Sequence, residues 1–207
     1  MILYVLTDEL LLPPADFLGR VEEALRGGAG MIQFREKIRT FDESVALGRP
    51  LATLCRRYGA PLIVNDSVPL ALAIGAAGVH LGKDDAGVED ARRALGSTAL
   101  IGVSCYADLE RARTAQAMGA DYVAFGACYP SRTKTSATPV SIGTIRAACA
   151  ALRVDVCCIG GIDATNVKPL VDAGAEIIAV CAAVFGGTDV YERTRSLINA
   201  ARAETAQ

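Results

Sequence analysis

Short runs of apolar residues recur along the whole chain, and eight of them have the length of a buried strand. They cover residues 2–6, 31–34, 62–64, 79–81, 100–103, 122–125, 156–159 and 177–181. Runs that are apolar at consecutive positions are typical of parallel strands with both faces covered. The pattern therefore predicts eight buried parallel strands.

The segments between these runs have apolar residues at helical spacing. Examples are Phe17, Val21, Ala24 and Leu25, then Leu47, Leu51 and Leu54, and then Leu109, Ala112 and Ala115. A glycine closes four of the segments just before the next strand, which is how many helices end: Gly28, Gly75, Gly119 and Gly174. We therefore expect repeated strand–helix units.

Eight such units fit into 207 residues with no linker or low-complexity tract between them. This favours an α/β fold, a single-domain (β/α)₈ barrel over residues 1–207, over an open doubly wound sheet. In a barrel of this kind the active site is built from the loops that follow the strands. Residues from distant parts of the sequence can therefore be considered together.

Composition narrows the class of protein. Apolar residues make up 52% of the chain, and the net charge of −2 offers no general attraction to nucleic acid or to an anionic membrane. The seven cysteines include no CxxC pair, so neither a disulfide framework nor a zinc site is indicated. No signal-peptide pattern precedes the first strand, so we expect a cytoplasmic protein with small-molecule substrates. The oligomeric state stays open, a homo-oligomer included.

The loop after the sixth strand carries the first candidate chemistry. Ser131, Thr133 and Lys134 supply two hydroxyls and an ammonium within four residues, which suits a phosphate or diphosphate. A solvated surface loop is the alternative.

After the second strand, alternation places Gln33, Arg35 and Lys37 on one side. Two cations and an amide would then face the barrel mouth. An exposed strand end balanced by Glu36 is the simpler interpretation for this segment alone. A second anion-binding loop elsewhere in the barrel reverses that preference.

Carboxylates follow the third and fourth strands. Asp66 and Asp85 are candidate Mg²⁺ ligands, because Mg²⁺ takes few protein oxygens and completes its shell with waters and phosphates. Helix capping is the alternative, above all for Asp84. His80, the only histidine, is expected to be a packed or hydrogen-bonded residue of the wall. Ser104 has no second histidine to activate it, which argues against a serine nucleophile.

The loops after the seventh and eighth strands contain small residues, Gly160 and Gly161 in one and Cys181 and Ala182 in the other. In such barrels these loops often hold a phosphate through backbone N–H groups. Paired glycines are also ordinary turn residues, so this evidence is weak alone.

Taken in order, these motifs resemble the thiamine phosphate synthase family over nearly the whole chain. The matching segments are Tyr4-Val5-Leu6-Thr7-Asp8, Gln33-Phe34-Arg35-Glu36-Lys37, Asn65-Asp66, His80-Leu81-Gly82 with Asp85, Gly102-Val103-Ser104, Gly126 through Lys134, and Ile159-Gly160-Gly161-Ile162. The resemblance implies a Mg²⁺-dependent transferase that joins a pyrimidine diphosphate to a thiazole phosphate, or to its 2-carboxylate, and releases diphosphate.

The resemblance also implies residue roles. The pyrimidine diphosphate would be held by Gln33, Arg35, Lys37, Asn65, Ser104 and Lys134. The thiazole phosphate would be held by Ser131, Thr133, Gly160, Gly161, Cys181 and Ala182. Asp66 and Asp85 would bind Mg²⁺. Arg35, Lys37 and Lys134 would be catalytic, because their charges stabilise the departing diphosphate.

Three positions depart from the family pattern: Lys83 replaces a usual Gln, Ser131 a usual Thr, and Ala182 a common Ser. The loss of a hydroxyl at Ala182 predicts weaker thiazole phosphate binding. Rival hypotheses are the related thiazole tautomerase, a phosphate-binding barrel isomerase or epimerase, and a barrel that only binds phosphates. The tautomerase uses a histidine after its fifth strand, where this chain has Tyr106.

Overall fold

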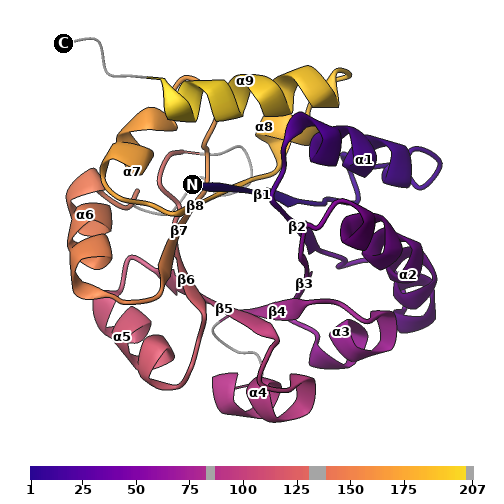
Figure 1. Cartoon of the computed structure of the whole chain (residues 1–207), viewed down its shortest axis with the longest axis horizontal. Helices are drawn as coiled ribbons and strands as arrows, with labels where there is room; N and C mark the ends of the chain where they lie inside the picture. Colours follow the sequence, from indigo (N-terminus) through magenta and orange to yellow (C-terminus); the bar gives the residue numbers. More distant parts are fainter. Residues whose placement is uncertain (83–86, 131–138, 204–207) are drawn as a thin grey trace.

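The computed structural model describes residues 1–82, 87–130 and 139–203 and forms a closed barrel of eight parallel strands, as predicted (Figure 1). Each strand pairs with its neighbours in chain order, and β1 closes the ring against β8. The strands are β1 Ile2–Leu6, β2 Met31–Phe34, β3 Leu62–Asn65, β4 Gly78–Leu81, β5 Leu100–Tyr106, β6 Tyr122–Gly126, β7 Asp155–Ile159 and β8 Ile177–Val180.

Helices surround the ring of strands (Figure 1). They are α1 Phe17–Gly27, α2 Phe41–Arg57, α3 Val68–Ile74, α4 Val88–Leu95, α5 Leu109–Ala117, α6 Ile142–Ala151, α7 Lys168–Asp172, α8 Ala182–Phe185 and α9 Val190–Arg202. Within the described ranges, no helix is long and apolar enough to cross a membrane.

Alternation along each strand divides the buried residues between two cores. In β1, Leu3 and Val5 belong to the larger core between the strands and the helices, whereas Tyr4 and Leu6 belong to a smaller cluster inside the barrel. The helices contribute their apolar stripes to the larger core. Phe17, the first residue of α1, is 1% exposed there.

The predicted helix ends are confirmed. Gly28 and Gly75 adopt left-handed conformations after α1 and α3, where a side chain would be strained. The strand that extends furthest beyond its predicted range is β5, which continues to Tyr106 instead of ending at residue 103. A register shift between Ser104 and Tyr106 allows Tyr106 to pair with Phe125 of β6.

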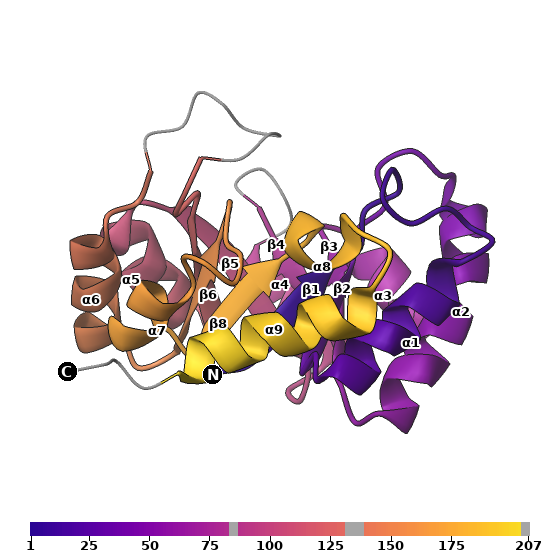
Figure 2. The ribbon, with the colours of Figure 1, turned by 90° about the horizontal axis from the view of Figure 1, so that it is seen from above.

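Because all eight strands are parallel, their carboxyl ends lie at one end of the barrel, which we call the mouth. The loop between β1 and α1 and the loop between β2 and α2 rise together at this end (Figure 2). The residues that follow β2, β3, β5, β7 and β8 are therefore brought to a common face.

Candidate active site

Arg35 follows the last residue of β2, and the loop after β1 positions it. Its backbone N–H donates to the buried hydroxyl of Thr7 over 3.0 Å. Its guanidinium lies 3.7 Å from the Asp8 carboxylate, with both side chains partly exposed. Asp8 also accepts the backbone N–H of Leu10 and so orders its own loop. Arg35 is thus held at the mouth with its charge accessible to solvent.

Lys37 and Asp66 come from different loops and meet at the mouth. The Lys37 ammonium lies 2.5 Å from Oδ2 of Asp66, and the side-chain amide of Asn65 donates to the same oxygen over 2.6 Å. Asp66 has a φ of 64°, a left-handed conformation that Asp and Asn tolerate better than most residues. Its backbone N–H donates to the carbonyl of His80 over 2.8 Å, which fixes the turn after β3.

The environment of Asp66 fits an ion such as Mg²⁺ in part. The carboxylate is partly exposed and surrounded by polar groups, and Mg²⁺ is commonly bound through one or two carboxylates plus waters and substrate phosphates. In the part of the chain that the structure describes, no three His, Cys, Asp or Glu residues cluster as a complete metal site. Asp66 would therefore need waters, substrate oxygens or a further carboxylate to complete the shell.

Below the mouth, a line of side-chain hydrogen bonds crosses the barrel from β2 to β5, which we call the interior row. The Gln33 amide donates to the Tyr4 hydroxyl over 2.7 Å, and this hydroxyl lies 3.1 Å from the hydroxyl of Tyr122. Tyr122 in turn lies 3.0 Å from Nδ1 of His80. Nε2 of His80 lies 2.9 Å from Oγ of Ser104. The interior row thereby links β1, β2, β4, β5 and β6 through polar atoms.

Burial determines the state of the two tyrosines. Desolvation raises the pKa of Tyr4 and of Tyr122 far above the usual value for a phenol, so both remain protonated. The Tyr4 and Tyr122 rings also meet edge to face, with centroids 6.0 Å apart. Both tyrosines therefore take part in the interior row as neutral hydroxyls.

His80 is a hydrogen-bonded residue of the wall, as the sequence predicts. Its contact with Ser104, and the part of Tyr4 and Tyr122 in the row, left no signal that the prediction used. Gln33 was expected beside Arg35 and Lys37, facing the mouth. Gln33 is instead 3% exposed and lies within the barrel, because β2 ends at Phe34 and only the residues beyond it reach the open face.

The glycines after β7 pack closely against the segment after β6. A Cβ on Gly160 would lie 2.6 Å from Cβ of Ala127, and one on Gly161 would lie 2.6 Å from the carbonyl oxygen of Pro130. Both glycines have positive φ, which a side chain would strain. The backbone N–H of Tyr129 donates to the Gly160 carbonyl over 2.9 Å. These glycines therefore bring two neighbouring loops together at the mouth.

Cys181 and Ala182 follow β8, next to the loop after β1. Burial raises the pKa of the Cys181 thiol to about 12, with the Asp8 carboxylate raising it further and Arg35 opposing the shift. Ala182 is exposed and begins the short helix α8.

Four predicted site residues lie outside the described residues: Asp85, Ser131, Thr133 and Lys134. The structure places the other ten in the loops at the mouth or, for Gln33 and Ser104, on the inner wall of the barrel just below it. Asp8, Tyr4 and Tyr122 were not predicted as site residues. Tyr4 in β1 and Tyr122 in β6 share the inward alternation of other barrel residues, which is the pattern that points to them. Asp8 lies in the loop after β1, where no alternation applies.

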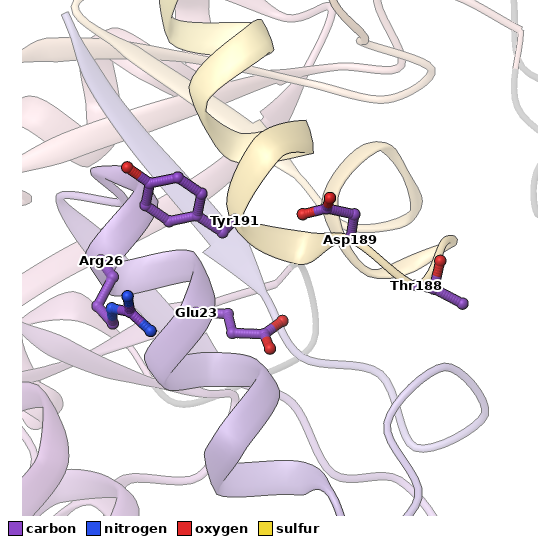
Figure 3. A pocket seen from close by; sticks show the side chains of 5 residues that line it. All are labelled: Glu23, Arg26, Thr188, Asp189 and Tyr191. Carbon is purple, nitrogen blue, oxygen red and sulfur yellow. The ribbon is translucent and has the colours of Figure 1, made fainter.

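Two surface cavities are lined by residues other than the predicted site residues. One, of about 380 Å³, lies between α1 and the start of α9 and is lined by Glu23, Arg26, Thr188, Asp189 and Tyr191 (Figure 3). A neighbouring cavity of about 720 Å³ lies between α1 and the segment after α8. Arg26 lies over the Tyr191 ring, 5.7 Å from its centroid. Neither cavity includes a predicted site residue, so the chemistry is better sought at the mouth.

Comparisons with known proteins show which proteins this chain is similar to. A family model described as thiamine monophosphate synthase matches residues 3–184. The chain is 47% identical to a thiamine-phosphate synthase of Methylococcus capsulatus over 195 residues, which cover 94% of this chain and 87% of the relative. It is also 47% identical to a thiamine-phosphate synthase of Thiobacillus denitrificans over 180 residues, 87% of this chain and 85% of the relative.

A solved structure extends the comparison to three dimensions. The thiamine phosphate pyrophosphorylase from Pyrococcus furiosus superposes with a TM-score of 0.88 and is 36% identical. The superposition covers 97% of this chain and 95% of that one. The barrel and its connecting helices are therefore shared along almost the full length of both.

Proposed function

This chain belongs to the thiamine monophosphate synthase family, and from that premise we propose which mouth residues bind each substrate, the metal ion and the leaving diphosphate. The enzyme is a transferase: it condenses 4-amino-2-methyl-5-(diphosphooxymethyl)pyrimidine with a thiazole phosphate and gives thiamine phosphate and diphosphate. The match over residues 3–184 carries this conclusion. The residue roles below are proposals.

Arg35 and Lys37 bind the diphosphate of the pyrimidine substrate. Both are cations at the mouth, held there by the carboxylates of Asp8 and Asp66. Guanidinium and ammonium groups recognise phosphate oxygens through charge-assisted hydrogen bonds. Lys134 is proposed to join them from outside the described residues. Gln33, Asn65 and Ser104 are proposed to complete this subsite from β2, β3 and β5.

The reaction breaks the bond between the pyrimidine methylene carbon and a diphosphate oxygen, and forms a bond from the same carbon to the thiazole nitrogen. Negative charge therefore grows on the departing diphosphate, and Arg35 and Lys37 stabilise it more strongly in the transition state than in the ground state. No protein nucleophile is needed. Holding both substrates in one mouth contributes through proximity.

Mg²⁺ dependence is general in this family, and we propose Asp66 and Asp85 as the ligands. The partly exposed carboxylate of Asp66 offers the oxygen donor that this ion prefers. When bound, the metal would supply positive charge to the diphosphate. Asn65 supports the role of Asp66 by holding one of its carboxylate oxygens.

The thiazole phosphate is proposed to bind across the mouth, at the loops after β6, β7 and β8. Gly160 and Gly161 are partly exposed and carry no side chain, and Cys181 and Ala182 lie at the turn into α8. Ser131 and Thr133 are assigned to this subsite from outside the described residues. Whether the thiazole 2-carboxylate phosphate is preferred is decided by comparing kcat/KM for the two substrates.

The decisive experiment measures diphosphate release in the presence and absence of Mg²⁺, for the unaltered chain and for Asp66→Asn. Asparagine retains the size of the side chain and tolerates the left-handed φ of 64°, so the fold should survive. We expect kcat/KM to fall by about 100-fold or more, the scale at which metal-site changes act. The matched control is Asp90→Asn, which removes an exposed carboxylate of α4 that pairs with Arg93.

Undiminished activity of Asp66→Asn would overturn the assignment of Asp66. The thiazole tautomerase alternative predicts isomerisation of a thiazole carboxylate phosphate with no diphosphate release. The residue at its histidine position, Tyr106, is 44% exposed at the end of β5. Tyr106 has no imidazole to take the place of that histidine, which favours the synthase.

A further inference from the structure

The hydrogen bonds of the interior row all run in one direction, from Gln33 towards Ser104. This follows from the number of hydrogens that each polar group can donate. The Tyr4 hydroxyl accepts a hydrogen from Gln33, and its other partner among the described residues is the Tyr122 hydroxyl. Tyr4 is 1% exposed, so its own hydrogen has to go to Tyr122 rather than to solvent. A buried hydroxyl that left its hydrogen without an acceptor would cost free energy.

The hydrogen bonds from Tyr122 to His80 and from His80 to Ser104 follow the same direction. Because the oxygen of Tyr122 accepts from Tyr4, its single hydrogen is available to Nδ1 of His80, 3.0 Å away. Nδ1 is then the acceptor nitrogen, which assigns the single ring hydrogen of an uncharged imidazole to Nε2. Nε2 donates to Oγ of Ser104 over 2.9 Å. The hydroxyl hydrogen of Ser104 is left to point elsewhere.

The absence of a side chain at Gly102 leaves the space that the interior row occupies. His80, Gly102 and Tyr122 lie in register on β4, β5 and β6. A Cβ on Gly102 would lie 2.0 Å from Cζ of Tyr122 and 2.4 Å from its hydroxyl oxygen. Only glycine therefore allows the tyrosine to pass across β5 and reach the imidazole. The Tyr122 ring also stacks on His80, with centroids 5.6 Å apart.

We propose that Tyr4 and Tyr122 are positioning residues that fix His80 as its Nε2–H tautomer and so present Ser104 as a hydrogen-bond donor to the substrate. The second half of this statement rests on the proposed function, in which Ser104 contacts the pyrimidine diphosphate. An acceptor on that substrate, a ring nitrogen or a diphosphate oxygen, would take the hydrogen of Ser104. The opposite tautomer would turn the same hydroxyl towards His80 and remove the donor.

The tautomer can be measured directly, because His80 is the only histidine in the chain. Long-range ¹H–¹⁵N correlation spectra of the ¹⁵N-labelled protein, taken at mildly alkaline pH, report on both ring nitrogens of one imidazole. We expect Nδ1 to have the shift of an unprotonated nitrogen and Nε2 that of a protonated one. Protonated Nδ1, a charged ring or exchange-averaged shifts would overturn the proposal. This measurement needs no variant and no activity.

Tyr122→Phe tests whether the row is the cause. The ring remains, but the hydroxyl that donates to Nδ1 is removed, so we expect the two nitrogen shifts to move towards each other as both tautomers become populated. An unchanged Nε2–H spectrum would overturn the role of Tyr122. The matched control is Tyr58→Phe, which removes an exposed hydroxyl bonded to Glu22 and should leave the spectrum as it is.

Steady-state kinetics of Tyr122→Phe test the consequence for the substrate. We expect the KM for the pyrimidine diphosphate to rise roughly threefold to tenfold, the scale of one neutral hydrogen bond, with the KM for the thiazole phosphate within about twofold of its original value. An equal rise in both constants would contradict the donor role of Ser104. If the unaltered chain releases no diphosphate, the proposed function fails, but the tautomer measurement still stands.

Discussion

The ammonium group of Lys37 lies 2.5 Å from a carboxylate oxygen of Asp66, so a cation from the loop after β2 meets an anion from the turn after β3. The two side chains are 48% and 31% exposed. An ion pair this accessible to solvent contributes little to folding. Its position at the mouth, beside Asn65 and near a second cation at Arg35, is better explained by the binding of an anionic substrate.

Replacement of Lys37 by Met should separate stability from activity. The pair is solvent-screened, so the free energy of unfolding should change by less than about 1 kcal/mol. The kcat/KM for the pyrimidine diphosphate should fall by about 100-fold, because one charge that stabilises the leaving group is lost. Urea unfolding and diphosphate-release assays measure the two quantities. Arg93→Met, on the outer surface of α4, is the control and should retain activity; similar losses in both variants would contradict a specific role for Lys37.

Gly102→Ala should damage the barrel from within. Its new Cβ would collide with the Tyr122 ring, which is enclosed by the strands and cannot move away freely. We expect the free energy of unfolding to fall by about 3 kcal/mol, as measured by urea denaturation. Gly19→Ala is the control: its Cβ would meet nothing within 4 Å, and helix propensity predicts a gain of about 0.5–1 kcal/mol. A harmless Gly102→Ala would show that the interior row is not tightly packed.

The rate of thiol alkylation should rise with pH, and the thiol with the lower pKa should react first. Only the thiolate reacts, and burial raises the pKa of Cys149 to about 11 and that of Cys181 to about 12. Both thiols should therefore react slowly at neutral pH and faster as the pH rises, with Cys149 ahead of Cys181. Mass spectrometry after iodoacetamide treatment resolves the two sites. Rapid labelling of Cys181 at neutral pH would contradict the raised pKa.

Ala182→Ser should restore a hydroxyl at the start of α8, where the family commonly has one. If the thiazole phosphate binds there, one added hydrogen bond should lower its KM by roughly threefold and leave the KM for the pyrimidine diphosphate unchanged. Ala151→Ser, at the exposed end of α6, is the control. No improvement in the thiazole KM would show that backbone groups alone suffice at this loop.

Local sequence patterns were enough to predict the barrel. Each strand is a short apolar run, and each helix has an apolar stripe that ends in many cases at a glycine such as Gly28, so every unit carries its own signal. The candidate residues at the mouth could be predicted for the same reason. Once the strands are parallel, residues that directly follow them, such as Arg35 and Asp66, must share one end of the barrel.

The interior row could not be predicted in this way, because its contacts arise only when the barrel closes. Tyr4 and Tyr122 are 118 positions apart in the sequence, yet their hydroxyls lie 3.1 Å apart. Their approach depends on strand register and on the missing side chain at Gly102, and neither leaves a local periodic pattern. Alternation places a side chain inside or outside the barrel, but the ring closure selects its partner, and with it the hydrogen-bonding state of His80.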